Sequence, residues 1–302
     1  MTTQTITGIE AEINRLVGDV GSLPTPPIVF SQIQKVLTDP NTSAYDIGGI
    51  LQEDPAISAK VLKMTNSAYY GLPRTIESVK QAVVIIGIEA IKNLVLSASV
   101  IDSFSKNKLD REFQDYFWRH SLATAFAARL LSRELSGQKV LDTESSFSAG
   151  LLHDIGKMVI SVYLSDLAEK IKAEKIEKPY LTDRVVENEI MGFDHTHIGA
   201  YLGGHWKLPA KLVEAVRYHH DPVACENPEN GLPHLIHLAN YLALHTFDLN
   251  QEEGNKIAID AVHGDVLEVV GLTEDDLLAY APALRDEYLK AETFLEMARG
   301  AA

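Results

Sequence analysis

The chain has 302 residues, 46% hydrophobic and 23% charged, an ordinary composition for a soluble globular protein that is long enough for an extensive core. Its formal net charge of −15 would be repelled by a phosphate backbone, so we expect no nucleic-acid partner. A single cysteine, no secretory signal at the N-terminus and no apolar run near the ~20 residues of a membrane span predict a cytoplasmic protein without internal disulfides or a membrane partner.

Helix signals follow one another through the first third of the chain. Ser43, Asp54 and Ser78 are typical N-cap residues, and Pro55 suits the first turn after Asp54. Ser78 also has a glutamine three residues later, the pattern of a capping box, and Gly87 is expected to end that helix. Apolar residues at helical spacing predict helices over residues 10–20, 28–37, 79–86 and 88–101, besides those that Ser43 and Asp54 begin.

The rest of the chain has the same helical periodicity. The predicted helices span residues 113–135, 145–162, 164–175, 181–191, 196–203, 209–220, 233–247, 257–261 and 266–270, with a last one through Leu284, Tyr288 and Phe294. No strand-like alternation persists, so we predict an all-α fold of two packed helical units. The polar stretch 103–110 reads as a linker, and the expected parts are 1–108, 109–250 and a helical extension over 251–302.

The pair His153-Asp154 is the clearest sign of chemistry in the sequence. It follows the small and apolar residues 148–152, and it offers an imidazole nitrogen beside a carboxylate oxygen. Mixed nitrogen and oxygen ligands suit zinc, iron, nickel or manganese, so we predict a divalent transition metal site. The candidate ligands, on helices that could converge, are His120, His153, Asp154, His195, His219 and His220.

Several of these histidines also have a purely structural interpretation. His120 lies among apolar residues at helical spacing, as a core histidine would. His195 and His197 flank one residue, so only one of them can easily face inward. His219-His220 close a predicted helix, where an imidazole could simply cap the last carbonyls.

Asp154 and Lys157 are the candidate catalytic residues. Lys157 lies three residues after Asp154, on the same face of a helix. In a hydrolase it would bind phosphate oxygens, and otherwise it would form an ion pair with Asp154.

Four segments resemble the HDOD domain family. Residues 54–71, which begin Asp-Pro-Ala-Ile-Ser and contain Met-Thr-Asn-Ser, are similar to that family's signature. Residues 78–96 resemble its next pair of helices, and 195–209 and 218–222 resemble its C-terminal half. The resemblance covers roughly residues 20–245. It implies a fold related to the HD-type metal-dependent phosphohydrolases, the second unit being an HD-like bundle, and a bacterial signalling or regulatory role.

The resemblance extends to the HD-GYP phosphodiesterases, whose ligand positions the six candidate ligands match and whose phosphate-side lysine Lys157 matches. Three departures count against such activity. Asn240 stands at the closing aspartate position, residues 221–225 replace a Gly-Tyr-Pro segment, and Tyr116 replaces a glutamate ligand.

Two functions follow from these residues. The first is a regulatory module that contacts a protein partner in a signalling pathway and keeps a partial metal site, with weak or absent hydrolysis. The alternative is a metal-dependent phosphohydrolase, a phosphodiesterase, whose ligand is a nucleotide or another phosphoester. Asn66 and Ser67, at a polar helix end, are a candidate partner or hinge site, unless Asn66 only caps its own helix.

Overall fold

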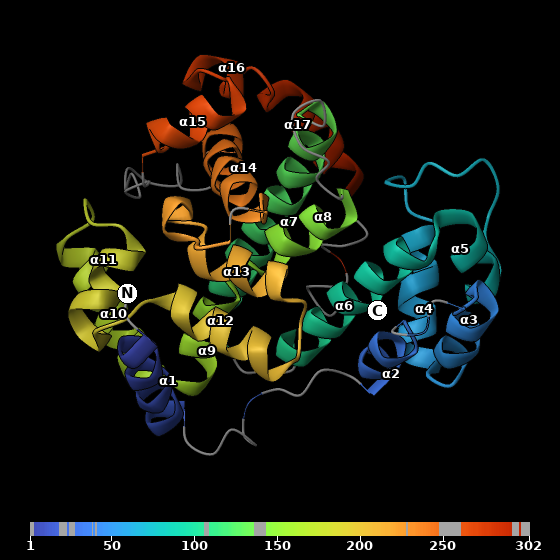
Figure 1. The fold of residues 1–302 in the computed structure, drawn as a ribbon, viewed down its shortest axis with the longest axis horizontal. Coiled ribbons are helices and arrows are strands. Elements are labelled where there is room, and N and C mark those ends of the chain that lie inside the picture. Colours follow the sequence, from blue (N-terminus) through green and yellow to red (C-terminus); the bar gives the residue numbers. More distant parts are fainter. Residues whose placement is uncertain are drawn as a thin grey trace. The chain divides into compact units, whose positions relative to one another are not determined.

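The computed structural model describes residues 3–17, 23, 28–37, 39, 41–105, 109–135, 143–227, 229–247, 261–291 and 296. Every regular element in these ranges is a helix, so the predicted all-α fold is confirmed. None of the described helices combines the length and the apolar character that crossing a bilayer requires. The chain forms two compact units (Figure 1). The smaller unit contains residues 25–122 and 285–302, and the larger unit contains residues 1–24 and 123–284.

The smaller unit is built from helices that pack on one another, including pairs that are not consecutive in the chain. Its helices are α2 (Ile28–Val36), α3 (Ala44–Gln52), α4 (Pro55–Thr65), α5 (Val79–Ile86), α6 (Ile88–Ser105) and the first half of α7 (Arg111–Glu134). α3 packs against α5, and α6 packs against α2, α4 and α5. Apolar side chains from all of these helices are buried, and they form the core of the unit.

The cap residues act as the sequence predicts. Ser43 and Asp54 accept backbone hydrogen bonds at the starts of α3 and α4, and Gly87, with φ of 89°, ends α5. Ser78 accepts from the backbone N–H three residues later. Its expected capping box is only half formed, because the Gln81 side chain accepts from the N–H of the residue before Ser78 instead.

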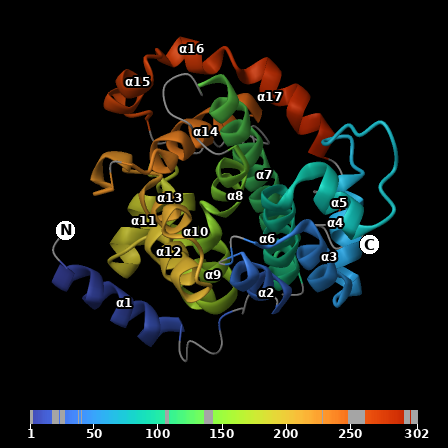
Figure 2. The same ribbon diagram turned by 45° about the vertical axis from the view of Figure 1, so that its right-hand side comes forward.

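The larger unit contains all of the candidate ligands except His120. The predicted helix through Leu284 and Tyr288 is α17 (Ala281–Tyr288), which the two units share after Leu284, and the 3₁₀ turn η3 (Leu289–Ala291) belongs to the smaller unit. The other helices lie wholly or partly in the larger unit. They are α1 (Thr3–Val17), the second half of α7, α8 (Thr143–Leu152), α9 (Ile155–Tyr163), α10 (Ser165–Glu177), α11 (Asp183–Met191), α12 (His195–His205), α13 (Ala210–Tyr218), the 3₁₀ turn η2 (Pro222–Ala224), α14 (Leu232–Phe247), α15 (Gly264–Val270) and α16 (Glu274–Leu278). α12 packs against α9, α13 and α1, while α13 and α14 pack on each other and on α8 (Figure 2). α10, which packs on α9 and α11, has no fully buried side chain.

The single helix predicted over 145–162 is wrong. α8 ends at Leu152, and α9 begins at Ile155 with Asp154 as its N-cap. The Asp154 side chain makes no capping hydrogen bond, so its carboxylate remains available to the histidines around it. The apolar periodicity continues through this break, which is why it could not be read from the pattern.

A glycine contact brings α9 and α12 together directly after this break. A Cβ on Gly156 would lie 1.9 Å from the carbonyl oxygen of His195, so no other residue fits there without moving backbone. Gly199 faces it from α12, where a Cβ would lie 3.2 Å from the Gly156 nitrogen and 2.7 Å from Val216 Cγ1. The two glycines thus set the close approach that places His153-Asp154 beside the start of α12.

The boundaries of the two units differ from the boundaries that the sequence predicts. The division falls inside α7, between Leu122 and Ala123, because this continuous helix contributes to both cores. The predicted parts 1–108, 109–250 and 251–302 remain predictions. The short helix α16 was not anticipated, and the expected helix over 257–261 lies, except for Ala261, outside the described residues, as do Phe294 and residues 18–20.

Asn66 joins the end of α4 to the loop that precedes α5. Its Nδ2 donates to the carbonyl oxygens of Leu62 at 3.0 Å and Ile76 at 2.8 Å, and its Oδ1 accepts from the Ile76 N–H at 2.7 Å. Ser67 is buried and donates to the carbonyl of Met64 at 2.6 Å. Asn66 therefore serves as the C-cap of α4, and the partner or hinge role of Asn66 and Ser67 remains a prediction.

We expect Asn66→Ala to lower the free energy of unfolding by about 1–3 kcal/mol, because it removes three hydrogen bonds and leaves backbone groups without them. Asn66→Asp tests the donors: it keeps the acceptor for the Ile76 N–H but places a carboxylate oxygen against the carbonyl oxygens of Leu62 and Ile76, so its loss should be at least as large. Chemical denaturation measures both. A loss as small as that of an average surface substitution would contradict this role for the Asn66 side chain.

Candidate metal centre

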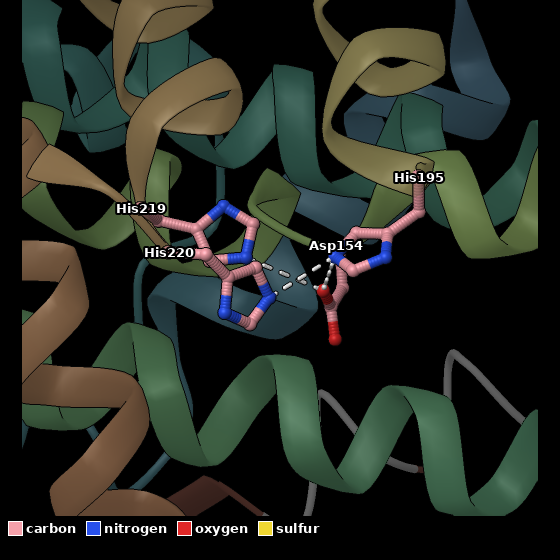
Figure 3. Close-up of side chains that lie close together, drawn as sticks. All are labelled: Asp154, His195, His219 and His220. Atoms are coloured by element: carbon pink, nitrogen blue, oxygen red, sulfur yellow. Dashed lines mark hydrogen bonds and ion pairs between the residues drawn. The ribbon is translucent and has the colours of Figure 1, made fainter. Parts of the chain in front are cut away.

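Asp154 lies at the centre of a cluster of histidines in the larger unit (Figure 3). Candidate ligand atoms of Asp154, His195, His219 and His220 all lie within 4.8 Å of one another. Asp154 Oδ1 is 3.1 Å from His195 Nε2 and 3.6 Å from His219 Nε2. His220 Nε2 lies 3.2 Å from His195 Nε2. His220 is half-buried and the other three are buried, so the structure brings four of the six predicted ligands to one point.

His153 approaches the other oxygen of the same carboxylate. Its Nε2 lies 3.4 Å from Asp154 Oδ2, and its ring packs edge-on against that of His219. His120 belongs to the smaller unit, where it is buried and stacks on Tyr116. His153 is therefore in contact with the cluster, while His120 remains a predicted ligand.

The imidazoles are oriented through their other nitrogen. His153 and His219 each place Nδ1 on the backbone carbonyl three residues earlier, at 2.7 and 2.9 Å. His195 places Nδ1 2.6 Å from the Glu187 carboxylate. A carbonyl or carboxylate oxygen accepts only, so in each ring Nδ1 carries the hydrogen and Nε2 faces Asp154. Histidines that bind metals are commonly oriented in this way, by a carbonyl or carboxylate on the second nitrogen.

Burial and charge act differently on the three rings. Burial lowers the pKa of His153 and His219 to about 3, so both rings are neutral near neutral pH and keep a lone pair on Nε2. Burial also lowers the pKa of His195, but Glu187 and Asp154 outweigh it and raise that pKa to about 10. Without a metal, His195 therefore carries a second proton, on Nε2 between Asp154 and His220.

The Asp154 carboxylate is charged in spite of its burial. Burial alone would raise its pKa, but His153, Lys157 and His195 lower the pKa well below its usual range. A buried carboxylate stabilised in this way can also accept a metal cation, since an oxygen ligand must be deprotonated to bind.

Lys157 forms the ion pair that was one of its two predicted roles. Its Nζ lies 2.8 Å from Asp154 Oδ2 and 3.1 Å from Asp183 Oδ2, and Lys175 lies 2.9 Å from the other oxygen of Asp183. Burial would lower the pKa of Lys157, but Asp154, Asp183 and Glu187 raise it well above its usual range. The lysine is thus charged and engaged on both sides. Catalytic roles for Asp154 and Lys157 remain predictions.

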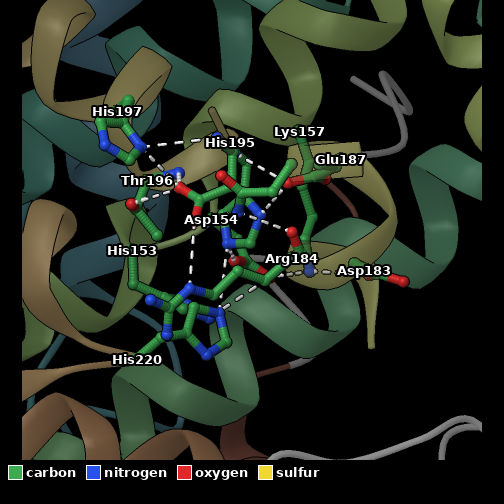
Figure 4. A network of polar contacts seen from close by, with 12 residues as sticks. His153, Asp154, Lys157, Asp183, Arg184, Glu187, His195, Thr196, His197 and His220 are labelled. Atoms are coloured by element: carbon green, nitrogen blue, oxygen red, sulfur yellow. Dashed lines mark hydrogen bonds and ion pairs between the residues drawn. The ribbon is translucent and has the colours of Figure 1, made fainter. Parts of the chain in front are cut away.

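Asp194 is the N-cap of α12, whose first residues His195, Thr196 and His197 are labelled in Figure 4. Its carboxylate accepts from the backbone N–H of Thr196 at 3.1 Å and pairs with Arg184 at 3.1 Å. His197 Nδ1 donates to the same carboxylate at 2.9 Å, and Arg217 lies 2.6 Å from His197 Nε2. Of the two histidines that flank Thr196, His195 therefore faces the cluster and His197 faces the cap.

Glu187 and Asp194 are the functional residues that the sequence did not reveal. Glu187 is 3% exposed, and it accepts both from the His195 ring and, at 2.8 Å, from the His195 backbone N–H. The sequence of α11 does not indicate this contact, because a buried glutamate and an exposed one are the same residue type and α11 has no other feature that distinguishes them. Asp194 precedes a predicted helix, so its cap role could have been read from its residue type.

The three departures from the hydrolase pattern lie on α14, around η2 and on α7. Asn240 is on α14, and its Oδ1 is buried and makes no hydrogen bond with the described residues. Residues 221–225 form η2 and its flanks instead of a Gly-Tyr-Pro segment. Tyr116 lies on α7.

A family model of the HDOD domain matches residues 23–222. The chain belongs to the HDOD domain family. It is 26% identical over 222 residues to an uncharacterized protein of Treponema pallidum (strain Nichols), a match that covers 72% of this chain and 41% of that protein. It is also 30% identical over 125 residues to Ribonuclease Y of Thermus thermophilus, covering 41% of this chain and 16% of that protein. The matches thus span less than half the length of these relatives.

Solved structures of similar fold cover nearly the whole HDOD chain. An HDOD domain protein of unknown function from Geobacter sulfurreducens superposes with a TM-score of 0.76 at 22% identity, over 98% of both chains. A protein provisionally named a signal transduction protein, from Marinobacter aquaeolei VT8, gives 0.76 at 21%, over 97% of this chain and 65% of that one. A protein provisionally named a metal-dependent phosphohydrolase, from Shewanella amazonensis SB2B, gives 0.62 at 23%, over 97% and 98%. At these identities the likeness shows the fold alone.

We expect Glu187→Gln to weaken metal binding by about 10-fold and Glu187→Ala by up to about 100-fold, as for other carboxylates behind a histidine ligand. The glutamine keeps an acceptor for His195 but removes the charge that makes the ring a stronger ligand. Titration of the metal-free protein with Zn²⁺ against a competing chelator measures the change. Glu189→Gln removes the same charge from an exposed position of α11 and is the control. Equal affinities for the two glutamine variants would contradict a supporting role for Glu187.

Proposed function

We propose that this chain is a bacterial regulatory HDOD protein whose larger unit holds a divalent transition metal and which acts through contacts with a protein partner. The observation that carries the proposal is the common orientation of His153, His195 and His219, each with Nδ1 on an oxygen and Nε2 facing Asp154. A buried set of this kind has little other use, because burying imidazoles and a carboxylate together costs free energy.

The donor chemistry fits the proposed metal. Imidazole nitrogens with one carboxylate oxygen suit zinc, iron, nickel or manganese, and the residues that would hold the ion are Asp154, His195, His219 and His220, with His153 and His120 as further candidates. When bound, such an ion lowers the pKa of a coordinated water and polarises phosphoryl oxygens.

Two features of the chain favour regulation over hydrolysis. Asn240 offers a neutral oxygen where a phosphodiesterase of this fold would have an aspartate, so a second cation would be held weakly. Lys157, the candidate phosphate ligand, is already paired with Asp154 and Asp183. Apolar side chains exposed on the packed helices α3 and α5 are in keeping with a protein partner: Tyr45, Val84 and Ile85.

A phosphohydrolase is the second candidate. The intact His153-Asp154 pair with Lys157 beside it favours this function, and the Thermus relative is an enzyme by name. In that case the ligand would be a nucleotide or another phosphoester, and Asp154 would hold the metal that activates water.

Metal content tests the proposed centre. We expect protein purified without chelator to contain stoichiometric transition metal by elemental analysis, and Asp154→Asn or His219→Ala to lose most of it. His205→Ala removes an exposed histidine from the end of α12 and should keep full metal content. Full metal content in the Asp154 and His219 variants would contradict the assignment.

Turnover separates the two functions. We expect the metal-loaded wild type to hydrolyse bis(p-nitrophenyl) phosphate and cyclic dinucleotides weakly or not at all, because a two-metal site needs an anionic closing ligand to hold ions about 3.5–4 Å apart. Asn240→Asp restores that charge, and it should raise the rate if the activity is latent. Robust wild-type turnover that Asp154→Asn abolishes would establish the phosphohydrolase instead.

A further inference from the structure

The C-terminal helices of the larger unit are joined to α14 and η2 by specific contacts. The His263 backbone N–H, at the start of α15, lies 3.0 Å from His237 Nε2 on α14. Glu274, the first residue of α16, accepts a hydrogen bond from the hydroxyl of Tyr241, also on α14. α15 packs against η2, which directly follows the segment of His219 and His220, and α16 packs against α14 (Figures 1 and 2).

His237 connects this C-terminal segment to a candidate metal ligand. Its Nδ1 lies 2.8 Å from the backbone carbonyl oxygen of His219. Since a carbonyl only accepts, Nδ1 carries the hydrogen, and Nε2 is left as the acceptor for the His263 N–H. One neutral imidazole, 5% exposed, thus spans from the backbone of His219 to the backbone of His263, and the His263 ring packs edge-on against it.

His219 is held both at its ring and at its backbone carbonyl. It follows the last turn of α13 as the C-cap, where the helix no longer fixes the backbone by its own hydrogen bonds. Its ring is oriented by Nδ1 on the Val216 carbonyl, and its own carbonyl is held by His237. A displacement of His237 would therefore move the backbone from which the His219 ring reaches Asp154.

We propose that residues 261–278 are a positioning element of the metal centre, which acts on His219 through His237, so that attachment of this segment and metal binding strengthen each other. The proposal rests on the metal-binding function proposed above. His237 reaches His219 through the backbone carbonyl and not through the ring, so the proposed role is positioning.

Coupling of this kind is reciprocal. If attachment of the segment raises metal affinity by a given factor, metal binding stabilises the attachment by the same factor. Loss of a hydrogen bond that orients a metal ligand typically weakens metal affinity by about 10- to 100-fold. We expect the lower end, about 10-fold, because His237 holds the backbone of His219 and leaves its ring untouched.

Substitutions at His263 isolate the link to the segment. His263 has φ of −72°, which proline adopts, so His263→Pro removes the donated N–H without forcing the backbone. His263→Ala keeps the N–H and removes only the ring, and it is the matched control. We expect His263→Pro to weaken Zn²⁺ binding by about 10-fold and His263→Ala to leave it nearly unchanged.

Two substitutions at His237 each remove one of its two hydrogen bonds and keep the other. In His237→Asn the amide N–H replaces Nδ1, so the hold on His219 is kept and the acceptor for His263 is lost. In His237→Gln the amide oxygen replaces Nε2, so the segment stays attached and the hold on His219 is lost. We expect both to weaken Zn²⁺ binding, because each breaks one half of the same connection.

The experiment titrates the metal-free full chain with Zn²⁺ and follows hydrogen exchange over 261–278 with and without the ion, with far-UV circular dichroism to confirm that each variant is folded. We expect Zn²⁺ to slow exchange of this segment in the wild type and in His263→Ala, and to leave it unchanged in His263→Pro and His237→Asn. Two results would overturn the coupling alone. In the first, the wild type binds Zn²⁺ but hydrogen exchange over 261–278 does not change. In the second, His263→Pro and His263→Ala bind Zn²⁺ with equal affinity. Wild type that binds no metal would overturn the proposed function and this inference together.

Discussion

The close approach of α9 to α12 is the constraint on which the histidine cluster around Asp154 depends. With a Cβ at Gly156 only 1.9 Å from the His195 carbonyl, backbone atoms of the two helices occupy the space that side chains fill at an ordinary helix contact. Every larger residue would move α12 outward and carry His195 away from Asp154. The position of the ligands therefore rests on the absence of a side chain, directly after the break between α8 and α9.

The cluster combines polar groups whose burial would cost free energy if each were buried alone. A carboxylate, a charged lysine and several imidazoles share a space with little water, and each is tolerated because another compensates it. Glu187 offsets the positive charge of His195, and Asp183 shares Lys157 with Asp154. The oxygens that orient the rings come from three different helices, so the imidazoles keep their directions through the folded scaffold and need no ion to set them.

The histidine cluster could be predicted because histidine is rare and chemically specific: the chain has 11, and four of them lie in contact around Asp154. Glu187 could not, because it is one of 42 acidic residues and differs from the others only in what α11 packs against. Helix caps such as Asp54 were readable, since a cap is a local interaction within a few residues. The break at His153-Asp154 was not, since apolar periodicity reports burial and continues across it. Sequence therefore showed the chemistry of the site, and tertiary contacts decided its geometry.

The lack of any fully buried side chain in α10 bears on the dynamics of the molecule. A helix that buries so little apolar surface has a low free energy of local opening, well below that of the core helices. Its neighbour α11 carries Glu187, and its Asp183 pairs with Lys157 of α9 and with Lys175 of α10. Transient detachment of this helical pair would take the carboxylate away from the His195 ring while the rest of the cluster stayed folded. For an ion bound as proposed, opening of this helical pair would be the way into the buried cluster that costs the least free energy.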